Sequence, residues 1–279
     1  MALKSPMPFL YALYLFTRSD IKTILLPIVV FAWYSSPLVS LRSFLSAALW
    51  TWLHLLQFCV SNQSLSPHED ALNKPWRPVP SGRITLRTAA ALRWLLLPLC
   101  FLCSIHYNVL SAGIVFPIGV LLHNELKLDS HWFTRNALNA LGYAVFDAGA
   151  TTIAHTGRID QLPAAVLMAH YFSIAIVLTT IHAQDFRDEA GDRAGKRNTI
   201  PIVMPRFSRL SMLVGPLLWS ATLGIVCSCS LAFSVILSAL AALIGLRFYL
   251  LRTPESDRTS YVLYNVWLGL ARITPILFS

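Results

Sequence analysis

The segment NQSLSPHEDALNKPWRPVPSGR, residues 62–83, places polar and acidic side chains at helical spacing directly after an apolar run. Asn62, Ser66 and Asp70 are four positions apart, and Glu69 lies one position off. Because residues three or four apart share one face of an α-helix, a continuing helix would bring these side chains together. Such a face could bind a cation, or it could belong to a solvated loop that caps a helix.

A second segment, QDFRDEAGDRAGKRNTIP at residues 184–201, repeats this arrangement. Asp185, Asp188 and Asp192 are three and four positions apart, so they also share a helical face. Stacked carboxylates repel one another, and a divalent cation that bridges them removes the repulsion. Mg²⁺ suits such a site, because it binds a few carboxylate oxygens and completes its shell with water and substrate phosphates.

Basic residues accompany both acidic groups and are suitable ligands for phosphate oxygens. They are Lys74, Arg77, Arg83, Arg187, Arg193, Lys196 and Arg197. One such segment on its own is typical of a solvated loop. Two segments on the same side of the protein favour a single site, to which each half of the chain supplies one carboxylate face.

The elements that must position these segments are apolar helices. Of the 279 residues, 56% are hydrophobic and only 13% are charged, and the mean hydropathy is +0.59, which is typical of a polytopic membrane protein. A helical crossing needs about 20 apolar residues, and no strand-like alternation is visible. The sequence therefore predicts an all-α fold with nine transmembrane helices, at roughly 23–41, 43–61, 87–104, 108–124, 138–155, 163–182, 209–228, 231–250 and 259–277.

Charge predicts the orientation of these helices. Lys and Arg gather on the side that carries the N-terminus and both polar segments, with Arg42, Arg158 and Arg272 as the exceptions. This side is expected to face the cytosol. The net charge of +9 then reflects topology, and we expect membrane lipid rather than nucleic acid around the protein. Residues 8–20 are predicted to form an interfacial helix, and the lack of a transit peptide favours the endoplasmic reticulum.

The spacing of the two segments indicates a weak internal duplication. They follow the second and sixth predicted crossings, so the chain divides into halves at about 1–136 and 137–279 within a single domain, 1–279. The cysteines lie in or beside apolar segments, and we expect them to pack there rather than bind metal. They are Cys59, Cys100, Cys103, Cys227 and Cys229.

Together the two segments resemble the signatures of the UbiA superfamily of intramembrane prenyltransferases. The first is similar to the plant-type pattern NQxxDxxxDxxNKPxxPxxSG, and the second is similar to DxxxD followed by a glycine and a basic run. The resemblance implies a UbiA-like helical bundle, a prenyl diphosphate substrate and Mg²⁺ as cofactor. It also implies individual roles: Asn62 and Asp70 would hold one Mg²⁺, Asp188 and Asp192 the other with Asp185 in support, and Lys127 and Arg135 would bind diphosphate.

The first segment departs from the pattern at its middle acid, where this chain has Ser66. A hydroxyl is a poorer Mg²⁺ ligand than a carboxylate, and Glu69 is the residue expected to replace the lost charge. This altered pattern resembles that of fungal members of the superfamily that act as terpene cyclases. In those enzymes the allylic cation, formed when diphosphate leaves, is captured by its own double bonds.

Three functions are compatible with these observations. The first is a Mg²⁺-dependent class I terpene cyclase, a carbon–oxygen lyase that acts on farnesyl (C15) or geranylgeranyl (C20) diphosphate with Asp70 and Asp188 essential for ionisation. The second is a prenyltransferase with an aromatic or lipid acceptor. The third is a transporter or scaffold, which would carry ionisable residues in several crossings. Here they gather at one face, and the 11% aromatic content favours a dry chamber for a cation.

Asp147, in YAVFDAGATT, is an acid inside a predicted crossing and is therefore a functional candidate. It could be a catalytic residue that closes a deprotonation step, or it could bond a neighbouring helix. His155, His170 and His182 are expected to make hydrogen bonds at helix ends or between helices.

Overall fold

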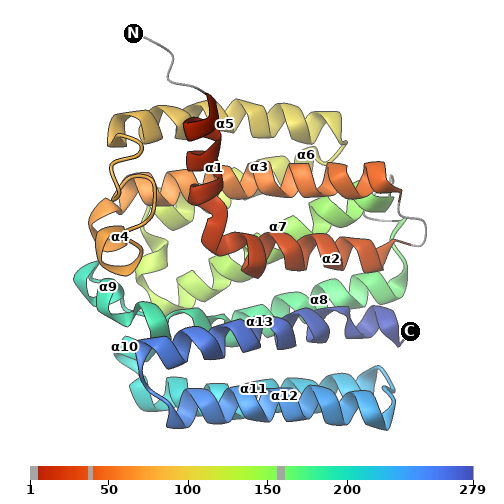
Figure 1. The fold of residues 1–279 in the computed structure, drawn as a ribbon. Coiled ribbons are helices and arrows are strands. Elements are labelled where there is room, and N and C mark those ends of the chain that lie inside the picture. The colour runs from red at the N-terminus through yellow and green to blue at the C-terminus, as the bar shows by residue number, and fades with distance from the viewer. Residues whose placement is uncertain (1–5, 37–39, 156–160, 279) are drawn as a thin grey trace.

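The computed structural model describes residues 6–36, 40–155 and 161–278, and within these ranges the protein consists of helices and connecting segments, with no strand (Figure 1). The α-helices are α1 (Pro6–Asp20), α2 (Leu26–Ser35), α3 (Leu41–Leu65), α4 (Pro67–Asn73), α5 (Leu86–His106), α6 (Leu110–Val120), α7 (Trp132–His155), α8 (Ala164–Thr180), α9 (Glu189–Ala194), α10 (Ile200–Val203), α11 (Pro205–Val226), α12 (Leu231–Leu250) and α13 (Pro254–Leu277). Short π- or 3₁₀-helices join them: η1 (Ile21–Leu25), η2 (Leu121–Glu125), η3 (Leu128–Ser130), η5 (Ile181–Gln184) and η6 (Phe186–Asp188). The predicted all-α fold is confirmed.

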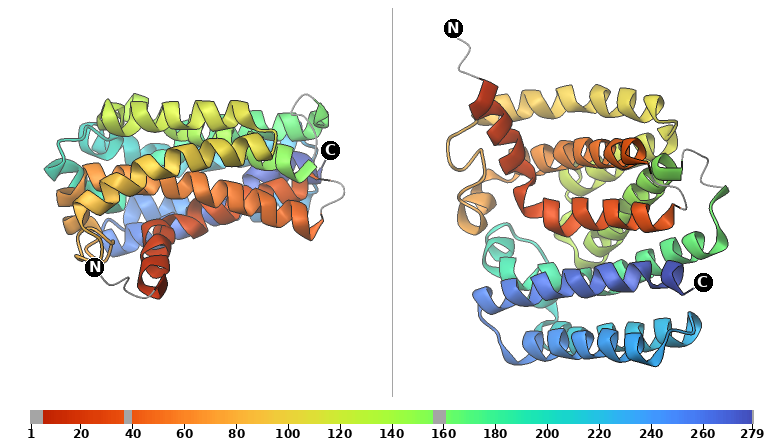
Figure 2. Two further views of the ribbon diagram at one scale, coloured as in Figure 1. Left: turned by 90° about the horizontal axis from the view of Figure 1, so that it is seen from above. Right: turned by 45° about the vertical axis from the view of Figure 1, so that its right-hand side comes forward.

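The long helices lie roughly side by side, with α5 and α3 toward one edge of the bundle and α11 and α12 at the other (Figure 1). Packing follows this order, because α3 contacts α5 and α7, α8 contacts α7 and α13, and α12 contacts α11 and α13. Figure 2 shows the same side-by-side arrangement of the long helices from two further directions. The short helices α4, α9 and α10 gather at one end of the bundle, and the C-terminus lies at the other. The two polar segments therefore share one end.

Among the described residues, five helical stretches are long and apolar enough to cross a membrane. They are Leu41–Leu65, Leu86–His106, Ala164–Ala194, Pro205–Val226 and Leu231–Leu250, and in the third of these the apolar part is α8. A shorter apolar helix spans Leu110–Glu125. The remaining predicted crossings fall in η1 and α2, in α7 and in α13, which do not meet the same measure of length and apolar composition. The count of nine stays a prediction.

The predicted interfacial helix, residues 8–20, falls within α1. In Figure 1 this helix crosses the direction of the other long helices before the chain turns through η1 into α2. Phe9, Leu10 and Tyr11 are exposed on it. An exposed apolar face on a helix that lies across the bundle fits a position at the membrane surface.

The chain breaks between α3 and α4 at Ser66, whose φ of −125° and ψ of 47° are not helical. Pro67 then begins α4, a position at which a missing backbone N–H is tolerated. The first polar segment thus bends where it leaves the bundle. This turns Glu69 and Asp70 away from the direction that a straight α3 would give them.

Candidate active site

The two polar segments meet at the end of the bundle because α4 packs against α9. Their approach is so close that a Cβ atom at Gly191 would lie 2.0 Å from Nδ2 of Asn73. Any larger residue at position 191 would push against the first segment. Glycine therefore lets the two acidic faces come together.

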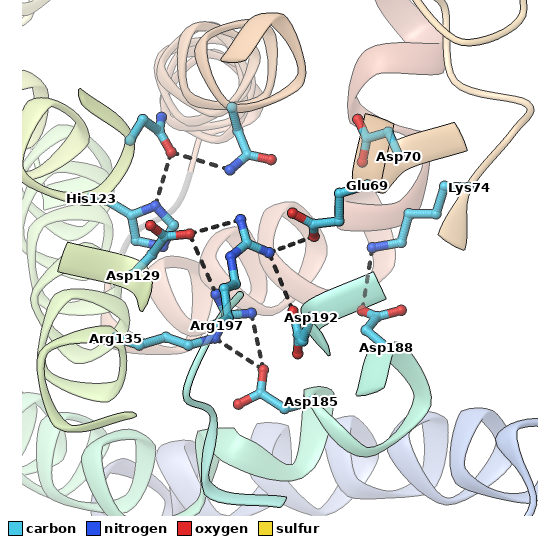
Figure 3. Close-up of polar contacts among 12 residues, drawn as sticks. Glu69, Asp70, Lys74, His123, Asp129, Arg135, Asp185, Asp188, Asp192 and Arg197 are labelled. Carbon is cyan, nitrogen blue, oxygen red and sulfur yellow. Dashed lines mark hydrogen bonds and ion pairs between the residues drawn. The ribbon is translucent and has the colours of Figure 1, made fainter. Parts of the chain in front are cut away.

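Arg197 lies at the centre of the acids (Figure 3). Its Nη1 donates to Glu69 and, at 3.2 Å, to Oδ1 of Asp192, and its Nη2 lies 2.7 Å from Oδ2 of Asp129. Only 9% of the Arg197 side chain is exposed. One buried guanidinium therefore joins the first segment, the second segment and the loop that follows α6, as its planar set of donors allows.

A second guanidinium, that of Arg135 near the start of α7, holds another acid. Its Nε and Nη2 each lie 3.0 Å from Oδ1 of Asp185, and its Nη1 lies 3.8 Å from Oδ2 of Asp129. Asp129 thus lies between Arg135 and Arg197. The resemblance implied Arg135 as a diphosphate ligand, with a purely topological role as the alternative, and its buried position links it to the acids.

Asp70 and Asp188 have basic partners from the first segment. Nη1 of Arg77 donates to Oδ1 of Asp70 at 2.5 Å, and Nζ of Lys74 lies 3.4 Å from Oδ2 of Asp188. Nε of Arg187 is 3.5 Å from the same oxygen of Asp188. The pair of Lys74 and Asp188 ties the two segments together directly.

Burial changes the proton affinity of the groups on α4 and just beyond it. It raises the pKa of Glu69, although the charge of Arg197 acts in the opposite direction. It also raises the pKa of Asp70 against the effect of Arg77, and it lowers the pKa of Lys74. In each case the charged form is the one disfavoured. Additional positive charge beside the two acids would therefore stabilise their ionised forms.

Several carboxylate oxygens are left over after these contacts. Within the part of the chain that the structure describes, Oδ2 of Asp70, Asp185 and Asp192 is buried without a hydrogen-bond partner. Such an oxygen is destabilising, and a divalent cation would satisfy it. The donor set therefore fits Mg²⁺. No three acidic, histidine or cysteine side chains among the described residues converge as a complete metal site, because arginines hold the acids in this conformation.

Three of these acids, Glu69, Asp188 and Asp192, line a polar cavity together with several of the bases, and this cavity adjoins an apolar one; Asp70 and Asp185 lie outside its lining. The polar cavity has about 850 Å³ of empty space, part of it open to the surroundings, and is lined by residues that include Asn62, Glu69, Lys74, Arg77, Arg187, Asp188, Asp192 and Arg197. The apolar cavity has about 550 Å³ of empty space, also partly open, and is formed mainly by α3, α6 and α7. Ile24, Phe58, His123, Asn139 and Tyr143 line both. A molecule with an anionic head and a hydrocarbon tail could therefore occupy the two together.

Ser66 and Glu69 differ in the cavities they line. Ser66 lines only a second polar cavity, with about 1140 Å³ of partly open space, whereas Glu69 lines both that cavity and the first one. Glu69 also bonds to Arg197, which reaches Asp192. Of these two residues it is therefore Glu69 that reaches the other carboxylates, which supports the predicted replacement of the missing acid.

Four of the predicted phosphate ligands lie outside the polar cavity. Lys127 is exposed and lines the second polar cavity instead. Arg193 is exposed and pairs with Glu189 at 2.7 Å within α9. Lys196 and Arg83 are also exposed. In this conformation none of the four approaches the acids as Lys74, Arg77 and Arg197 do.

Asp147 belongs to a separate ion pair inside the bundle and lines neither of the joined cavities. Arg272 of α13 donates to its Oδ1, and Ser173 of α8 donates to its Oδ2 at 2.9 Å. Nε of Arg272 donates in turn to Oγ of Ser173 at 2.8 Å. Both oxygens of this fully buried carboxylate are engaged. This favours a structural role, joining α7, α8 and α13, over the predicted catalytic one.

The family model of the UbiA prenyltransferase family matches residues 24–269 of the chain. The chain belongs to the UbiA prenyltransferase family. The resemblance seen in the two polar segments is thereby confirmed.

Curated UbiA-type relatives include two fungal enzymes. The chain is 34% identical to the fumagillin beta-trans-bergamotene synthase of Aspergillus fumigatus, over 98% of this chain and 94% of that protein. It is 29% identical to a diterpene cyclase of Hericium erinaceus, over 90% of this chain and 82% of that protein. Both similarities extend well beyond the two polar segments.

Among solved structures, a UbiA homologue from Archaeoglobus fulgidus bound to GPP and Mg²⁺ has a TM-score of 0.64 and 18% identity, over 94% of this chain and 99% of that chain. At this identity the likeness shows a shared fold. The family together with the five apolar helices makes this chain an integral membrane protein.

The sequence did not point to two further residues of this candidate site. Asp129 is buried between two arginines, and Asn124 accepts a hydrogen bond from Nδ2 of Asn62 at 3.1 Å and bonds to Nδ1 of His123 at 2.9 Å. The predicted topology puts the loop after the fourth crossing on the same side as both polar segments. Asp129 was therefore a candidate on topology alone, whereas Asn124 is the last residue of the predicted fourth crossing.

Proposed function

We propose that this UbiA protein is a Mg²⁺-dependent intramembrane terpene cyclase. It ionises a C15 or C20 prenyl diphosphate, closes the resulting cation into a terpene hydrocarbon and releases diphosphate. The observation that carries the proposal is the joined pair of cavities, one lined by acids and bases and the other by apolar and aromatic side chains. The names of the two fungal relatives support the same activity.

The polar cavity would bind the diphosphate head. Lys74, Arg187 and Arg197 line it and supply N–H donors for phosphate oxygens. Each of these side chains is paired with a carboxylate in the present conformation. Binding of the substrate would exchange carboxylate partners for phosphate oxygens and free the acids for metal.

The acids around this cavity would hold the metal. The proposed ligands are Asn62, Glu69, Asp70, Asp185, Asp188 and Asp192, and three of them have an unpartnered buried oxygen. When bound there, Mg²⁺ would neutralise the charge that develops on the leaving oxygen. The carboxylates would fix the position of the metal. Because they belong to the two polar segments, that position is at the mouth of the apolar cavity.

The apolar cavity would hold and fold the prenyl chain. Phe58 and Tyr143 line it where it meets the polar cavity, and Phe116 and Phe146 line it further in. Aromatic faces stabilise a passing cation, and apolar walls exclude the water that would otherwise capture it as an alcohol. The diphosphate departs with the electrons of the C–O bond, a double bond of the chain attacks the cation, and loss of a proton ends the reaction.

A prenyltransferase is the second candidate, and one observation favours it. The second polar cavity adjoins the first and shares Asn62, Glu69 and Arg197 with it. A polar acceptor could occupy this space beside the diphosphate. The two candidates differ in one requirement, because a transferase releases its product only when an acceptor is present.

The proposed topology has nine crossings in one domain, with both polar segments on the cytosolic side of the endoplasmic reticulum membrane. A single reporter cysteine at His68, on α4, tests the orientation in sealed microsomes. We expect a membrane-impermeant maleimide added outside to label His68→Cys in a variant that lacks the native cysteines. Labelling only after the vesicles are opened would reverse the orientation.

The experiment that tests the activity uses membranes that carry the full chain. They are incubated with C10, C15 or C20 prenyl diphosphate and Mg²⁺, without acceptor, and the organic extract is analysed by gas chromatography–mass spectrometry. We expect a cyclic hydrocarbon that Asp188→Ala does not make. Absence of a hydrocarbon from wild-type protein, with product restored by an added acceptor, would establish the transferase instead.

A further inference from the structure

Two phenylalanine rings line the apolar cavity away from the polar one. Phe116 of α6 and Phe146 of α7 both line it, and their ring centres are 4.6 Å apart, so the two rings meet across the space between the helices. Behind them lies Trp50 of α3, whose ring is edge-on to Phe146 at 6.2 Å. His54 is edge-on to Phe116 at 5.8 Å. We call Phe116 and Phe146 the aromatic floor.

The residues behind the aromatic floor hold it in place. Nε1 of Trp50 donates to Oγ of Ser104 at 2.9 Å, and that hydroxyl also bonds to Nε2 of His54 at 3.1 Å. A Cβ atom at Gly149 would lie 2.3 Å from the Trp50 ring, so α7 rests directly on this indole. Trp50 and His54 are fully buried. The rings of Phe116 and Phe146 therefore cannot shift toward α3 without breaking these buried hydrogen bonds and packing contacts.

The depth of the cavity follows from the helices that line it. His123 and Phe116 are seven positions apart, as are Asn139 and Phe146, and the first of each pair lies at the polar mouth and the second at the floor. At 1.5 Å per residue, the floor lies about 10 Å from the mouth.

This depth can be compared with extended prenyl chains. A fully extended backbone advances by about 1.2 Å per bond, so the main chains of C10, C15 and C20 prenyl groups reach roughly 8, 13 and 18 Å. A C10 chain fits without folding. A C15 chain exceeds the depth slightly and must bend, which brings its double bonds toward the cation, whereas a C20 chain exceeds it by a wide margin.

We infer that the aromatic floor sets the chain length of the substrate and selects a C15 diphosphate over a C20 one. This inference rests on the proposed function, which leaves the length open. One fungal relative is named a diterpene cyclase, so a C20 substrate is the alternative that the test must exclude.

The test opens the floor and measures diphosphate release from C10, C15 and C20 substrates separately. For wild-type protein we expect kcat/KM to be highest with C15. Phe116→Ala and Phe146→Ala should each raise the ratio of C20 to C15 turnover by tenfold or more, because the first change extends the cavity toward His54 and the second extends it toward Trp50. Phe116→Leu, which removes less volume, should shift the ratio in the same direction if an alanine variant fails to fold.

A complementary variant narrows the cavity. Gly142 lines it, and a Cβ atom there would meet nothing within 4 Å. Gly142→Leu should therefore fold, and it should depress turnover of C15 at least tenfold more than turnover of C10. Phe233→Ala is the matched control, because Phe233 packs against Phe278 in another part of the bundle, with ring centres 4.8 Å apart. It should leave all the length ratios unchanged.

The outcomes separate the two proposals. Wild-type protein that releases no diphosphate from any chain length without acceptor would contradict the proposed function. A wild-type preference for C20, or unchanged ratios in the Phe116 and Phe146 variants when turnover is intact, would overturn the role of the floor and leave the cyclase activity standing.

Discussion

The ion pair of Asp147 and Arg272 inside the bundle and the acids around Arg197 at its polar end both join arginine to carboxylates away from solvent, although the first pair is more deeply buried. Inside the bundle, one arginine meets one acid, and both carboxylate oxygens have partners. The guanidinium of Arg272 also lies 5.0 Å from the ring centres of both Phe31 and Tyr143.

The polar end is built differently. There, two arginines are shared among four acids, and buried carboxylate oxygens remain without partners. A cavity adjoins these acids, whereas Asp147 lines neither of the joined cavities. Burial and charge alone therefore do not distinguish the two groups of acids. The unpartnered carboxylate oxygens and the adjoining cavity do.

The largest effect that this comparison predicts is on stability. Asp147→Ala should lower the free energy of unfolding by about 3–5 kcal/mol, because it leaves the charge of Arg272 buried without a partner. Thermal unfolding in detergent measures the change. If Asp147→Ala unfolds like wild type but has lost turnover, Asp147 has a catalytic role and not a structural one.

The double variant Asp147→Ala, Arg272→Met is the control for this prediction. Replacing both partners removes the unpaired charge, and an apolar replacement of a buried ion pair is often neutral. We therefore expect it to recover part of the stability that the single variant loses. A further loss would mean that Arg272 stabilises the protein through its aromatic neighbours instead.

The second prediction concerns the polar end, where the effect should fall on turnover. Asp188→Ala should lower kcat by about 10²–10³-fold, the range for loss of one group that stabilises developing charge. Its unfolding temperature should stay near that of wild type, since the carboxylate is held by the flexible side chains of Lys74 and Arg187. Asp188→Ala should therefore change kcat far more than the unfolding temperature, whereas Asp147→Ala should chiefly lower the unfolding temperature.

The third prediction concerns the metal and does not depend on turnover. Mg²⁺ with inorganic diphosphate should raise the unfolding temperature of wild-type protein, by the equivalent of about 2.7 kcal/mol at a hundred times the dissociation constant. Asp188→Ala combined with Asp192→Ala should abolish this shift. The matched control is Asp257→Ala, which breaks a buried pair with Arg209 at 2.6 Å outside the site and should keep the shift. Equal shifts in all variants would place the cation elsewhere.

The sequence predicted the general architecture because its signals are local. Apolar runs of helical length indicate an all-α membrane fold, however the helices pack against one another. The two acidic patterns indicated the family, which the family match confirms. Glu69 could be proposed as the substitute for the missing acid because it is adjacent to Asp70. These inferences require only spacing along the chain.

The contacts between distant segments could not be predicted in this way. Whether Lys127 or Lys74 reaches the acids depends on where each loop turns, and Lys127 takes a left-handed conformation, with φ of 53°, on the exposed side of its loop. The aromatic floor was hidden because a helix that is apolar on all sides shows no preferred inward face. The partner of Asp147 is 125 positions away, so only the packing of α7 against neighbouring helices reveals it.

The smallest predicted effect distinguishes the two polar cavities. Ser66→Asp restores the acid of the superfamily pattern, yet Ser66 lines the second polar cavity rather than the one that holds the acids, and Glu69 already supplies a carboxylate there. Turnover should therefore change by no more than about tenfold, a difference of roughly 1.4 kcal/mol in the barrier. The same change combined with Glu69→Gln should not recover turnover that Glu69→Gln alone has lost, because position 66 lines only the second of the two polar cavities. If Ser66→Asp abolishes turnover while Glu69→Gln does not, the hydroxyl itself takes part in the reaction, and the metal would be held without Glu69.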